Sequence, residues 1–86
     1  MRIDFHRNFD KRLSKLNNKQ KEQLKLRLVE FVQDKYKPEL NNHALRGKYK
    51  GYRSINVTGD IRAVFIPHSE NHVEFVHIGS HSQLYG

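Results

Sequence analysis

The run Ile61-Arg62-Ala63-Val64-Phe65-Ile66 constrains the fold of this chain more than any other segment. Apart from its arginine the run is apolar, as is typical of a strand that is buried on both faces of a sheet. Such a strand needs a layer of helices on one face and further cover on the other. Arg62 is the exception, because a charged side chain in a buried strand requires either a partner or a function.

Two further strand patterns flank this run. They cover residues Tyr52–Val57 and His72–Ile78, and the connections Thr58–Asp60 and Pro67–Asn71 are short. Short connections predict antiparallel neighbours. The second half of the chain therefore predicts three antiparallel strands.

The first half predicts one strand and a helical hairpin. Residues Arg2–Phe5 alternate polar and apolar side chains, which indicates a short strand with Ile3 and Phe5 facing a core. A short amphipathic helix is expected to follow Asn8 as its N-cap. A longer helix is expected from about Lys19 to Lys35.

The longer helix is expected to bury one side and to end near a proline. Its apolar residues are Leu24, Leu28, Phe31 and Val32 on one stripe, widened by Leu26 and Val29. Pro38 stops the helix because proline lacks a backbone donor and restricts Lys37 before it. A loop is expected over Glu39–Gly51, and the polar ending Gly79–Gly86 is expected to fray. Residues 1–86 therefore predict a single α+β domain with an N-terminal strand, a helical hairpin and then three antiparallel strands.

The charge of the chain indicates an anionic partner. It has 16 Lys and Arg residues against 9 Asp and Glu residues, a formal net charge of +7, and nucleic acid is the commonest partner of small basic domains. The chain has no cysteine, which excludes disulfides and thiolate metal sites and suits the reducing cytoplasm. No apolar run is long enough to span a bilayer, so no membrane association is expected.

A basic segment before the first of the three strands carries the strongest nucleic-acid signal. Its cations are Arg46, Lys48, Lys50 and Arg53, and Tyr49 and Tyr52 lie among them. Cations bind phosphates and aromatic rings stack on bases, so the segment suits RNA. The cations of the predicted helices fit a solvated face about equally well.

Residues near this segment supply the groups that metal-free RNA cleavage needs. His43 and His81 can transfer protons near neutral pH, one from the ribose 2′-hydroxyl and one to the leaving 5′-oxygen. Asp60 and Arg62 stand at the start of the middle strand, where Arg62 can stabilise the charge on the phosphorane. The alternative interpretation of Arg62 is an ion pair with Asp60 or Glu74.

The six histidines do not predict a metal site. His68 and His72 are four residues apart across a turn rather than on a helix, and no third ligand follows at a recurrent spacing. We interpret these two and His6 as surface residues, and we expect no metal and no cofactor.

Two segments resemble the YafQ branch of the RelE/ParE toxin superfamily. They are HALRGKYKGYR at residues 43–53 and GSHSQLYG at residues 79–86. The resemblance implies a RelE-like microbial ribonuclease fold and a ribosome-dependent mRNA endonuclease that acts in the ribosomal A site in the bacterial cytoplasm. It also implies that the toxin is a monomer when free and forms a heteromeric complex with a cognate antitoxin.

By position, the resemblance implies that His43, Asp60 and His81 are catalytic residues and that Tyr85 is a functional terminal aromatic. Two departures stand out. The branch has a further histidine where this chain has Asn56, and a tryptophan where it has Ile61. Asn56 is expected to hold RNA by hydrogen bonds, and Arg62 matches an arginine that RelE-type members use for phosphate contact.

Two other functions stay open at this point. A ParE-like toxin would share the fold but act on gyrase without cutting RNA, and a basic RNA-binding module would show salt-dependent binding without cleavage. Histidines at both His43 and His81 favour the nuclease, because protein binding does not require paired proton carriers.

Overall fold

The computed structural model of the chain describes residues 1–85, and Gly86, the last residue of the expected frayed end, lies outside the described residues. The elements in chain order are β1 (Arg2–Phe5), α1 (Arg7–Leu13), α2 (Asn18–Gln33), the 3-10 turn η1 (Pro38–Leu40), β2 (His43–Ala44), the 3-10 turn η2 (Gly47–Tyr49), β3 (Arg53–Asn56), β4 (Ile61–Ser69), β5 (His72–Ser80) and α3 (His81–Tyr85). Within this range no helix combines the length and the apolar character needed to cross a membrane.

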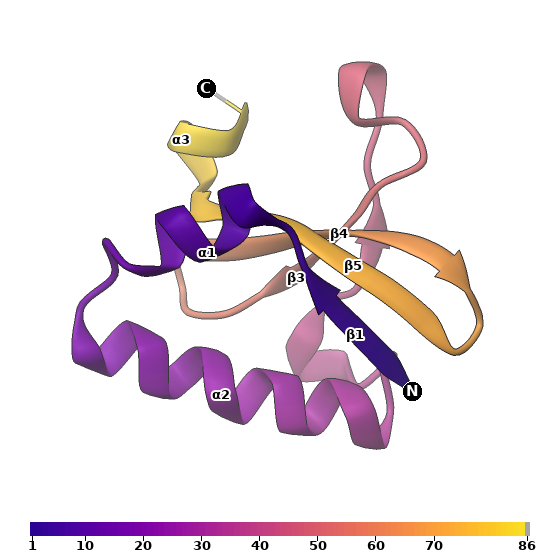
Figure 1. The fold of residues 1–86 in the computed structure, drawn as a ribbon, viewed down its shortest axis with the longest axis horizontal. Coiled ribbons are helices and arrows are strands. Elements are labelled where there is room, and N and C mark those ends of the chain that lie inside the picture. The colour runs from indigo at the N-terminus through magenta and orange to yellow at the C-terminus, as the bar shows by residue number, and fades with distance from the viewer. Residues whose placement is uncertain (86) are drawn as a thin grey trace.

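The strands form one five-stranded sheet in the order β1-β5-β4-β3-β2. The long β4–β5 hairpin is central, and β1 pairs with β5 in parallel while the other neighbours are antiparallel (Figure 1). The predicted α+β class and the three antiparallel strands are confirmed. The segment Glu39–Gly51 is not wholly a loop, because His43 and Ala44 pair with Ser54 and Arg53 and add an edge strand.

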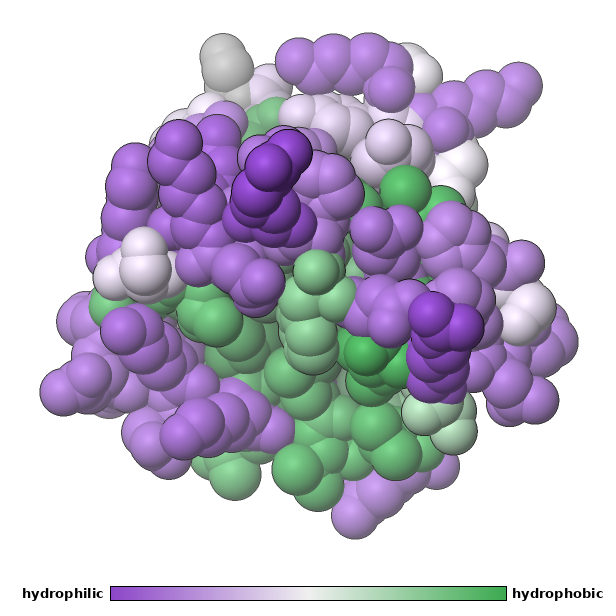
Figure 2. Space-filling model, viewed as in Figure 1, coloured by the Kyte–Doolittle hydropathy of each residue, from purple (hydrophilic) through white to green (hydrophobic). Residues whose placement is uncertain are grey.

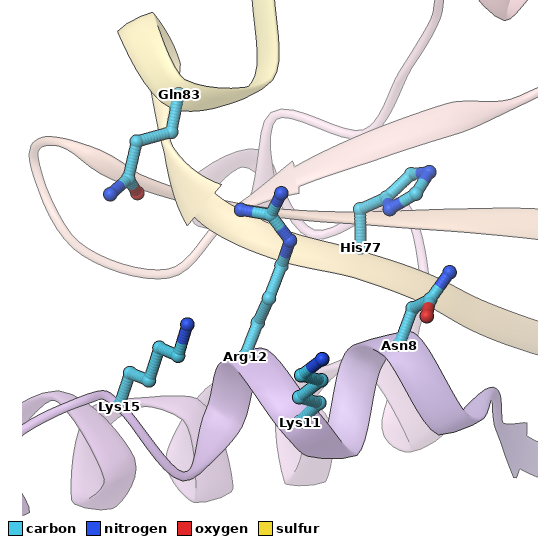
Figure 3. Close-up of a pocket in the computed structure, with 6 residues that line it drawn as sticks. All are labelled: Asn8, Lys11, Arg12, Lys15, His77 and Gln83. Atoms are coloured by element: carbon cyan, nitrogen blue, oxygen red, sulfur yellow. The ribbon is translucent and has the colours of Figure 1, made fainter.

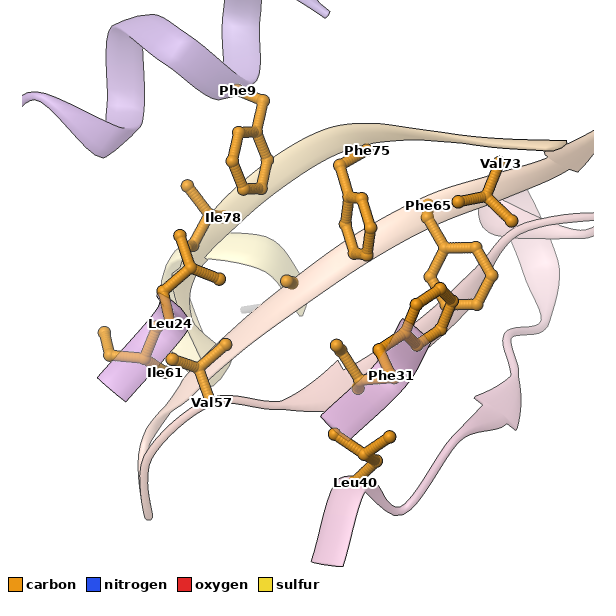
Figure 4. Packing of buried hydrophobic residues seen from close by; sticks show 12 residues of the cluster. Phe9, Leu24, Phe31, Leu40, Val57, Ile61, Phe65, Val73, Phe75 and Ile78 are labelled. Atoms are coloured by element: carbon orange, nitrogen blue, oxygen red, sulfur yellow. The ribbon is translucent and has the colours of Figure 1, made fainter. Parts of the chain in front are cut away.

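One face of the sheet, called the α2 face here, packs against α2 and the buried side of α1. Its core is built around Phe75, whose ring centroid lies 5.7 Å from Phe9, 5.6 Å from Phe31 and 5.2 Å from Phe65 (Figure 4). All four rings are at most 1% exposed. Phe5 stacks at the rim of this group and is 42% exposed, so it faces the core only in part.

The other face, called the α3 face here, is covered by α3 and the segment around η2. Leu84 of α3 packs with Val64 and Val76. The Tyr49 hydroxyl donates a hydrogen bond to the Leu84 carbonyl at 3.1 Å, which ties η2 to α3. The α3 face is therefore closed by two short segments rather than by a long helix.

The expectation that the polar ending frays is wrong for residues 81–85. The Ser80 hydroxyl accepts a hydrogen bond from the Gln83 backbone at 3.1 Å, and the Gln83 side chain accepts one from the Ser80 backbone at 2.8 Å. This reciprocal capping box satisfies donors at the start of α3. Burial of Leu84 then stabilises a helix that would be too short by itself.

The helices begin and end at slightly different residues from those predicted. His6, not Asn8, caps α1, because its ring Nδ1 accepts a hydrogen bond from the Asn8 backbone at 3.0 Å. Asn17 and Gln20 form a capping box at the start of α2. α2 ends at Gln33, before Pro38 can act, and Pro38 instead begins η1.

Only part of the predicted apolar stripe of α2 is buried. Leu24 and Phe31 face the sheet, whereas Leu26, Val29 and Val32 are 58%, 57% and 55% exposed. Val32 was expected on the buried stripe and is not there, because residues 26, 29 and 32 follow one another at three-residue steps along a different side of the helix. Figure 2 shows hydrophobic surface in its lower half, in the region where Figure 1 places α2.

Candidate functional site

Strand pairing places several of the predicted residues in two rows on the α3 face. The first row is His43, Ser54, Val64 and His77, which are successive partners on β2, β3, β4 and β5. The second row is Asn56, Arg62 and Gly79 on β3, β4 and β5. Paired residues on neighbouring strands point to the same side of a sheet, so both rows belong to one surface.

Arg62 is half-buried and keeps its charge available. Its Nη1 atom donates to the carbonyls of Thr58 at 3.0 Å and of Ile61 at 3.2 Å. Within residues 1–85 no ion pair joins Arg62 to Asp60 or to Glu74, which contradicts the alternative interpretation of this arginine. Carbonyl oxygens orient a guanidinium without neutralising it, so Arg62 can still bind a phosphate.

The turn between β3 and β4 meets the start of α3. The His81 backbone donates a hydrogen bond to the Asp60 carbonyl at 3.2 Å, and the His81 ring lies 4.9 Å from the ring of Tyr85. Arg62 follows Asp60 by two residues on β4. The fold thus brings Asp60, Arg62, His81 and Tyr85 into one neighbourhood.

His43 stands apart from this neighbourhood. Its Nδ1 atom lies 2.8 Å from the Asn41 carbonyl, so Nδ1 carries a proton there and Nε2 of the neutral ring is free to accept one. β2 is three strands away from β5, about 14 Å across the sheet at a strand spacing of about 4.8 Å. No hydrogen bond or ring contact between described residues joins His43 to His81.

The predicted RNA-binding cations divide between the two faces. Arg46, Lys48 and Lys50 are exposed around η2, and Lys48 Nζ lies 5.3 Å from the centroid of the Tyr49 ring. Arg53 points to the α2 face, where its Nε donates to the Asn42 side chain at 2.8 Å. Arg53 is therefore not brought together with the other predicted residues.

Three buried polar atoms of the α3 face have no hydrogen-bond partner among the described residues. They are Ser54 Oγ, Asn56 Oδ1 and the Tyr85 hydroxyl. Tyr49 lies over this region, with its ring 5.8 Å from Tyr85 and 6.1 Å from His77. An unpaired buried polar atom costs about 1–3 kcal/mol, so these atoms are suited to meet a ligand. Ser54 was not foreseen from the sequence, because its strand pattern alone gives no sign of the cover over it.

A second group of residues missed by sequence reasoning lines a cleft between α1, β5 and α3. They are Asn8, Lys11, Arg12, Lys15, His77 and Gln83 (Figure 3). Burial lowers the pKa of the His77 imidazole below its usual value, and the charges of Arg12 and His6 lower it further. His77 is therefore mostly neutral at pH 7. Lys11 lies on α1 and Lys15 two residues after it, and only the folded chain shows that both line a cleft with β5.

The histidines of the β4–β5 hairpin form side-chain hydrogen bonds with carboxylates. His68 Nε2 lies 3.1 Å from Glu74 and His72 Nε2 lies 2.9 Å from Asp4, and the Asp4 pKa is lowered chiefly by its hydrogen bond to His72. His72 is half-buried rather than on the surface. Residues 1–85 hold no cluster of three or more side chains arranged to bind a metal ion.

Comparison with known proteins identifies related chains. A family model described as bacterial toxin of type II toxin-antitoxin system, YafQ, matches residues 1–86. The crystal structure of YafQ from E. coli strain BL21(DE3) is similar over 100% of both chains, with 23% identity and a TM-score of 0.80.

Two further structures share the fold. The toxin chain in the E. coli DinJ-YafQ toxin-antitoxin complex is 24% identical, with a TM-score of 0.76 and coverage of 98% of this chain and 96% of that one. A YoeB/ParE toxin from Agrobacterium tumefaciens is 15% identical, with a TM-score of 0.76 and coverage of 94% and 99%. No curated protein sequence matches the chain.

Proposed function

The chain belongs to the YafQ family of toxins from bacterial type II toxin–antitoxin systems, and on that basis we propose that it inhibits translation as a ribosome-dependent mRNA endonuclease. The substrate is mRNA in the ribosomal A site. The reaction is attack of the ribose 2′-oxygen on the adjacent phosphorus, which forms a cyclic phosphate and releases the 5′-oxygen of the next nucleotide.

The observation that carries this proposal is the grouping of acid–base and cationic side chains at one end of the α3 face. Asp60, Arg62 and His81 meet where the β3–β4 turn contacts the first residue of α3. Proton carriers beside an uncompensated guanidinium are the groups that phosphodiester cleavage without a metal requires. A surface that only binds protein has no need of this combination.

Each residue has a chemical role in the proposed reaction. Asp60 and His81 are the two proton carriers that lie together, so one of them accepts the proton of the 2′-hydroxyl as the phosphorus–oxygen bond forms, and the other donates a proton to the departing 5′-oxygen. Arg62 stabilises the additional negative charge on the phosphorane, because its guanidinium fits phosphate oxygens in a bidentate manner. His43 lies on β2, about 14 Å across the sheet from β5 and too far to act on the same phosphate, so it contacts the RNA where the strand crosses the α3 face.

Binding groups surround these catalytic positions. Lys48, Lys50 and Arg46 are exposed on the segment beside the α3 face and are available to phosphates of the mRNA or the ribosome. Asn56 and Tyr85 each carry a buried polar atom that has no partner among residues 1–85, and a nucleobase edge can supply one.

We also propose that an antitoxin protein encoded together with this chain neutralises it. The E. coli YafQ structure that includes DinJ is a toxin–antitoxin complex with the same fold. A net charge of +7 favours fast association with an acidic segment, which can fold over the basic surface as it binds. Co-purification with the product of a neighbouring gene tests this part of the proposal.

The endonuclease itself is tested by inducing the chain in a bacterial host and mapping new mRNA 5′ ends against the reading frame. We expect cuts at a fixed position within codons of translated messages. We expect His81→Ala to reduce the cleavage rate by about 10²–10⁴, the usual contribution of a positioned proton carrier. His68→Ala is the matched control, because it removes a histidine from the β4–β5 hairpin outside the proposed site.

Two results would contradict this assignment. Growth inhibition without new mRNA ends, together with stalled gyrase on DNA, would indicate a ParE-like action. A folded His81→Ala variant that cleaves at the wild-type rate would remove His81 from the reaction.

A further inference from the structure

The cleft between α1, β5 and α3 lies outside the proposed catalytic group and is strongly basic. Its volume is about 380 Å³. Three of its six lining residues are cations on α1 or just after it, namely Lys11, Arg12 and Lys15. Arg12 extends from α1 toward β5 between His77 and Gln83 (Figure 3). Among the described residues, no carboxylate lines this cleft.

The three cations have no acidic partner within residues 1–85. Six ion pairs link other side chains, but none includes Lys11, Arg12 or Lys15. Like charges in one cleft repel one another, and the repulsion is relieved when an anion enters. The neutral His77 adds a hydrogen-bonding group without adding charge.

The cleft opens beside the residues proposed to act on the phosphate. A Cβ atom built on Gly79 would lie 3.7 Å from Arg12 Nη1, so the guanidinium reaches the backbone of Gly79. Gly79 is the cross-strand partner of Arg62. Gly79 thus has Arg12 beside it and Arg62 opposite it on β4, and the Arg62 guanidinium itself binds the Thr58 and Ile61 carbonyls. The cleft therefore lies next to the strand position that carries Arg62.

The charge is spread along the cleft rather than gathered at one point. Lys11 and Arg12 lie in the last turn of α1, and Lys15 lies two residues beyond its end at Leu13, so the cations extend along the length of one wall of the cleft. A single small anion would use only part of this length. A polymer with a charge on every unit would use all of it.

We propose that this cleft binds the phosphate backbone of RNA beyond the cleavage site, with Arg12 as its central contact. The proposal rests on the proposed endonuclease function and adds a binding surface to it. The phosphates belong either to the mRNA or to ribosomal RNA, and the chemistry of recognition is the same for both. Arg12 binds and positions RNA here and takes no part in proton transfer.

The test compares two triple variants of the full chain that lose the same charge. One is Lys11→Gln/Arg12→Gln/Lys15→Gln in the cleft, and the control is Lys19→Gln/Lys21→Gln/Lys25→Gln on α2. Each reduces the net charge of +7 by three. Thermal unfolding is used to check that both triple variants are folded. The single variant Arg12→Gln tests the central contact with a smaller loss of charge.

Two probes separate the sources of phosphate. The first is a short single strand of 2′-O-methyl RNA, which lacks the attacking hydroxyl, and the second is vacant ribosomes without mRNA. Binding is measured between about 50 and 200 mM salt, where each phosphate contact to a single strand contributes about 0.7 to the slope of log K against log salt. We expect the cleft variant to bind about tenfold more weakly at low salt, with a slope smaller by about 2, and the control to change far less.

Cleavage in mRNA-programmed ribosomes completes the experiment. We expect the cleft variant to raise KM while kcat is kept, because the cleft supplies binding rather than chemistry. If the cleft variant loses binding only to the single-stranded RNA, the cleft binds mRNA. If it loses binding only to vacant ribosomes, the cleft binds ribosomal RNA.

Other results would overturn the inference or the function on which it rests. If the two triple variants bind RNA equally well and have equal KM values, the cleft cations act only through the net charge of the protein and not through a specific site. Weakened binding of an acidic antitoxin segment, with RNA binding and KM unchanged, would assign the cleft to a protein partner instead. A wild-type chain that neither binds RNA nor cuts mRNA would refute the endonuclease function itself. If the wild-type chain cuts mRNA and the cleft variant binds RNA and cuts mRNA as well as the wild type, only the inference about the cleft is refuted.

Discussion

Gly79 lies directly opposite Arg62 in the β4–β5 ladder, so the position across from the arginine carries no side chain. A Cβ atom at Gly79 would come within 2.9 Å of Gln83 Oε1, the atom that accepts the hydrogen bond from the Ser80 backbone. We expect Gly79→Ala to displace this carboxamide and cost about 1 kcal/mol of unfolding free energy. Amide exchange in residues 80–85 should rise, and growth inhibition should weaken.

Gly59→Ala is the control for this variant. A Cβ atom there would meet nothing within 4 Å. Equal exchange in the two variants would show that Gly79 does not support α3.

Ser54 is buried, and its hydroxyl has no hydrogen-bond partner in the part of the chain that the structure describes, so its removal should be harmless to the fold. We expect Ser54→Ala to leave the free energy of unfolding unchanged or raise it by up to about 1 kcal/mol, because no hydrogen bond is lost. Urea denaturation measures the change. Ser14→Ala is the matched substitution at a hydroxyl that donates to the Lys11 carbonyl at 2.7 Å, and it should destabilise slightly. Marked destabilisation by Ser54→Ala would mean that the hydroxyl has a partner, such as a water molecule.

Lys48 and Lys50 are exposed beside η2 and are expected to contact phosphates. The double variant Lys48→Ala/Lys50→Ala should bind mRNA-programmed ribosomes more weakly, with a salt slope smaller by about 1.4 for two lost contacts. Lys19→Ala/Lys25→Ala on α2 removes the same charge as a control. An unchanged slope in the first variant would place these lysines on a solvated face.

The His77 imidazole should titrate below pH 6.5. Burial lowers its pKa, as do the charges of Arg12 and His6, and Lys11 and Lys15 line the same cleft. The unfolded chain therefore binds more protons at this residue than the folded chain, so the His77 contribution to stability falls as the pH drops below about 6.5.

Histidine NMR signals followed against pH test this prediction. The His77 pKa should be higher in the Arg12→Gln variant, because one positive charge beside the ring is removed. It should also rise when RNA phosphate enters the cleft. Titration of His77 at or above 6.5 in the free wild-type chain would contradict the proposed surroundings of the ring.

The strands could be predicted because each carries a local pattern of apolar residues. Ile61–Ile66 was correctly expected to be covered on both faces, but β4 continues through Pro67 to Ser69. Proline is tolerated there because the β4–β5 register is irregular between Pro67 and Ser69. The prediction that Pro67 begins a turn therefore ends the strand at Ile66, three residues too early.

Local patterns could not reveal which distant segments pair. Arg2 lies beside His72 in the parallel β1–β5 ladder, and nothing in residues 2–5 specifies that partner. The edge strand β2 at His43 could not be predicted from the sequence either, because two residues are too few to show an alternation.

Only part of the candidate site could be predicted from the sequence. The sequence predicts that His43, Asp60, Arg62 and His81 lie together beside the basic segment. The fold brings Asp60, Arg62 and His81 together but leaves His43 on the edge strand β2. The opposite orientation of Arg53 follows from its alternation with Ser54, so it could have been inferred from the sequence. The basic cleft could not, because it depends on how α1 lies against β5.

The pairing of β1 with β5 has a consequence for how this protein comes into being. Synthesis runs from the N-terminus, so β1 must wait without its neighbour until residues 72–75 emerge. The same late segment carries Gly79 and leads into His81 and Tyr85. A nascent or truncated chain that stops before β5 thus lacks the β4–β5 hairpin at the middle of the sheet and one wall of the site, and neither is complete until residues 72–85 have been made.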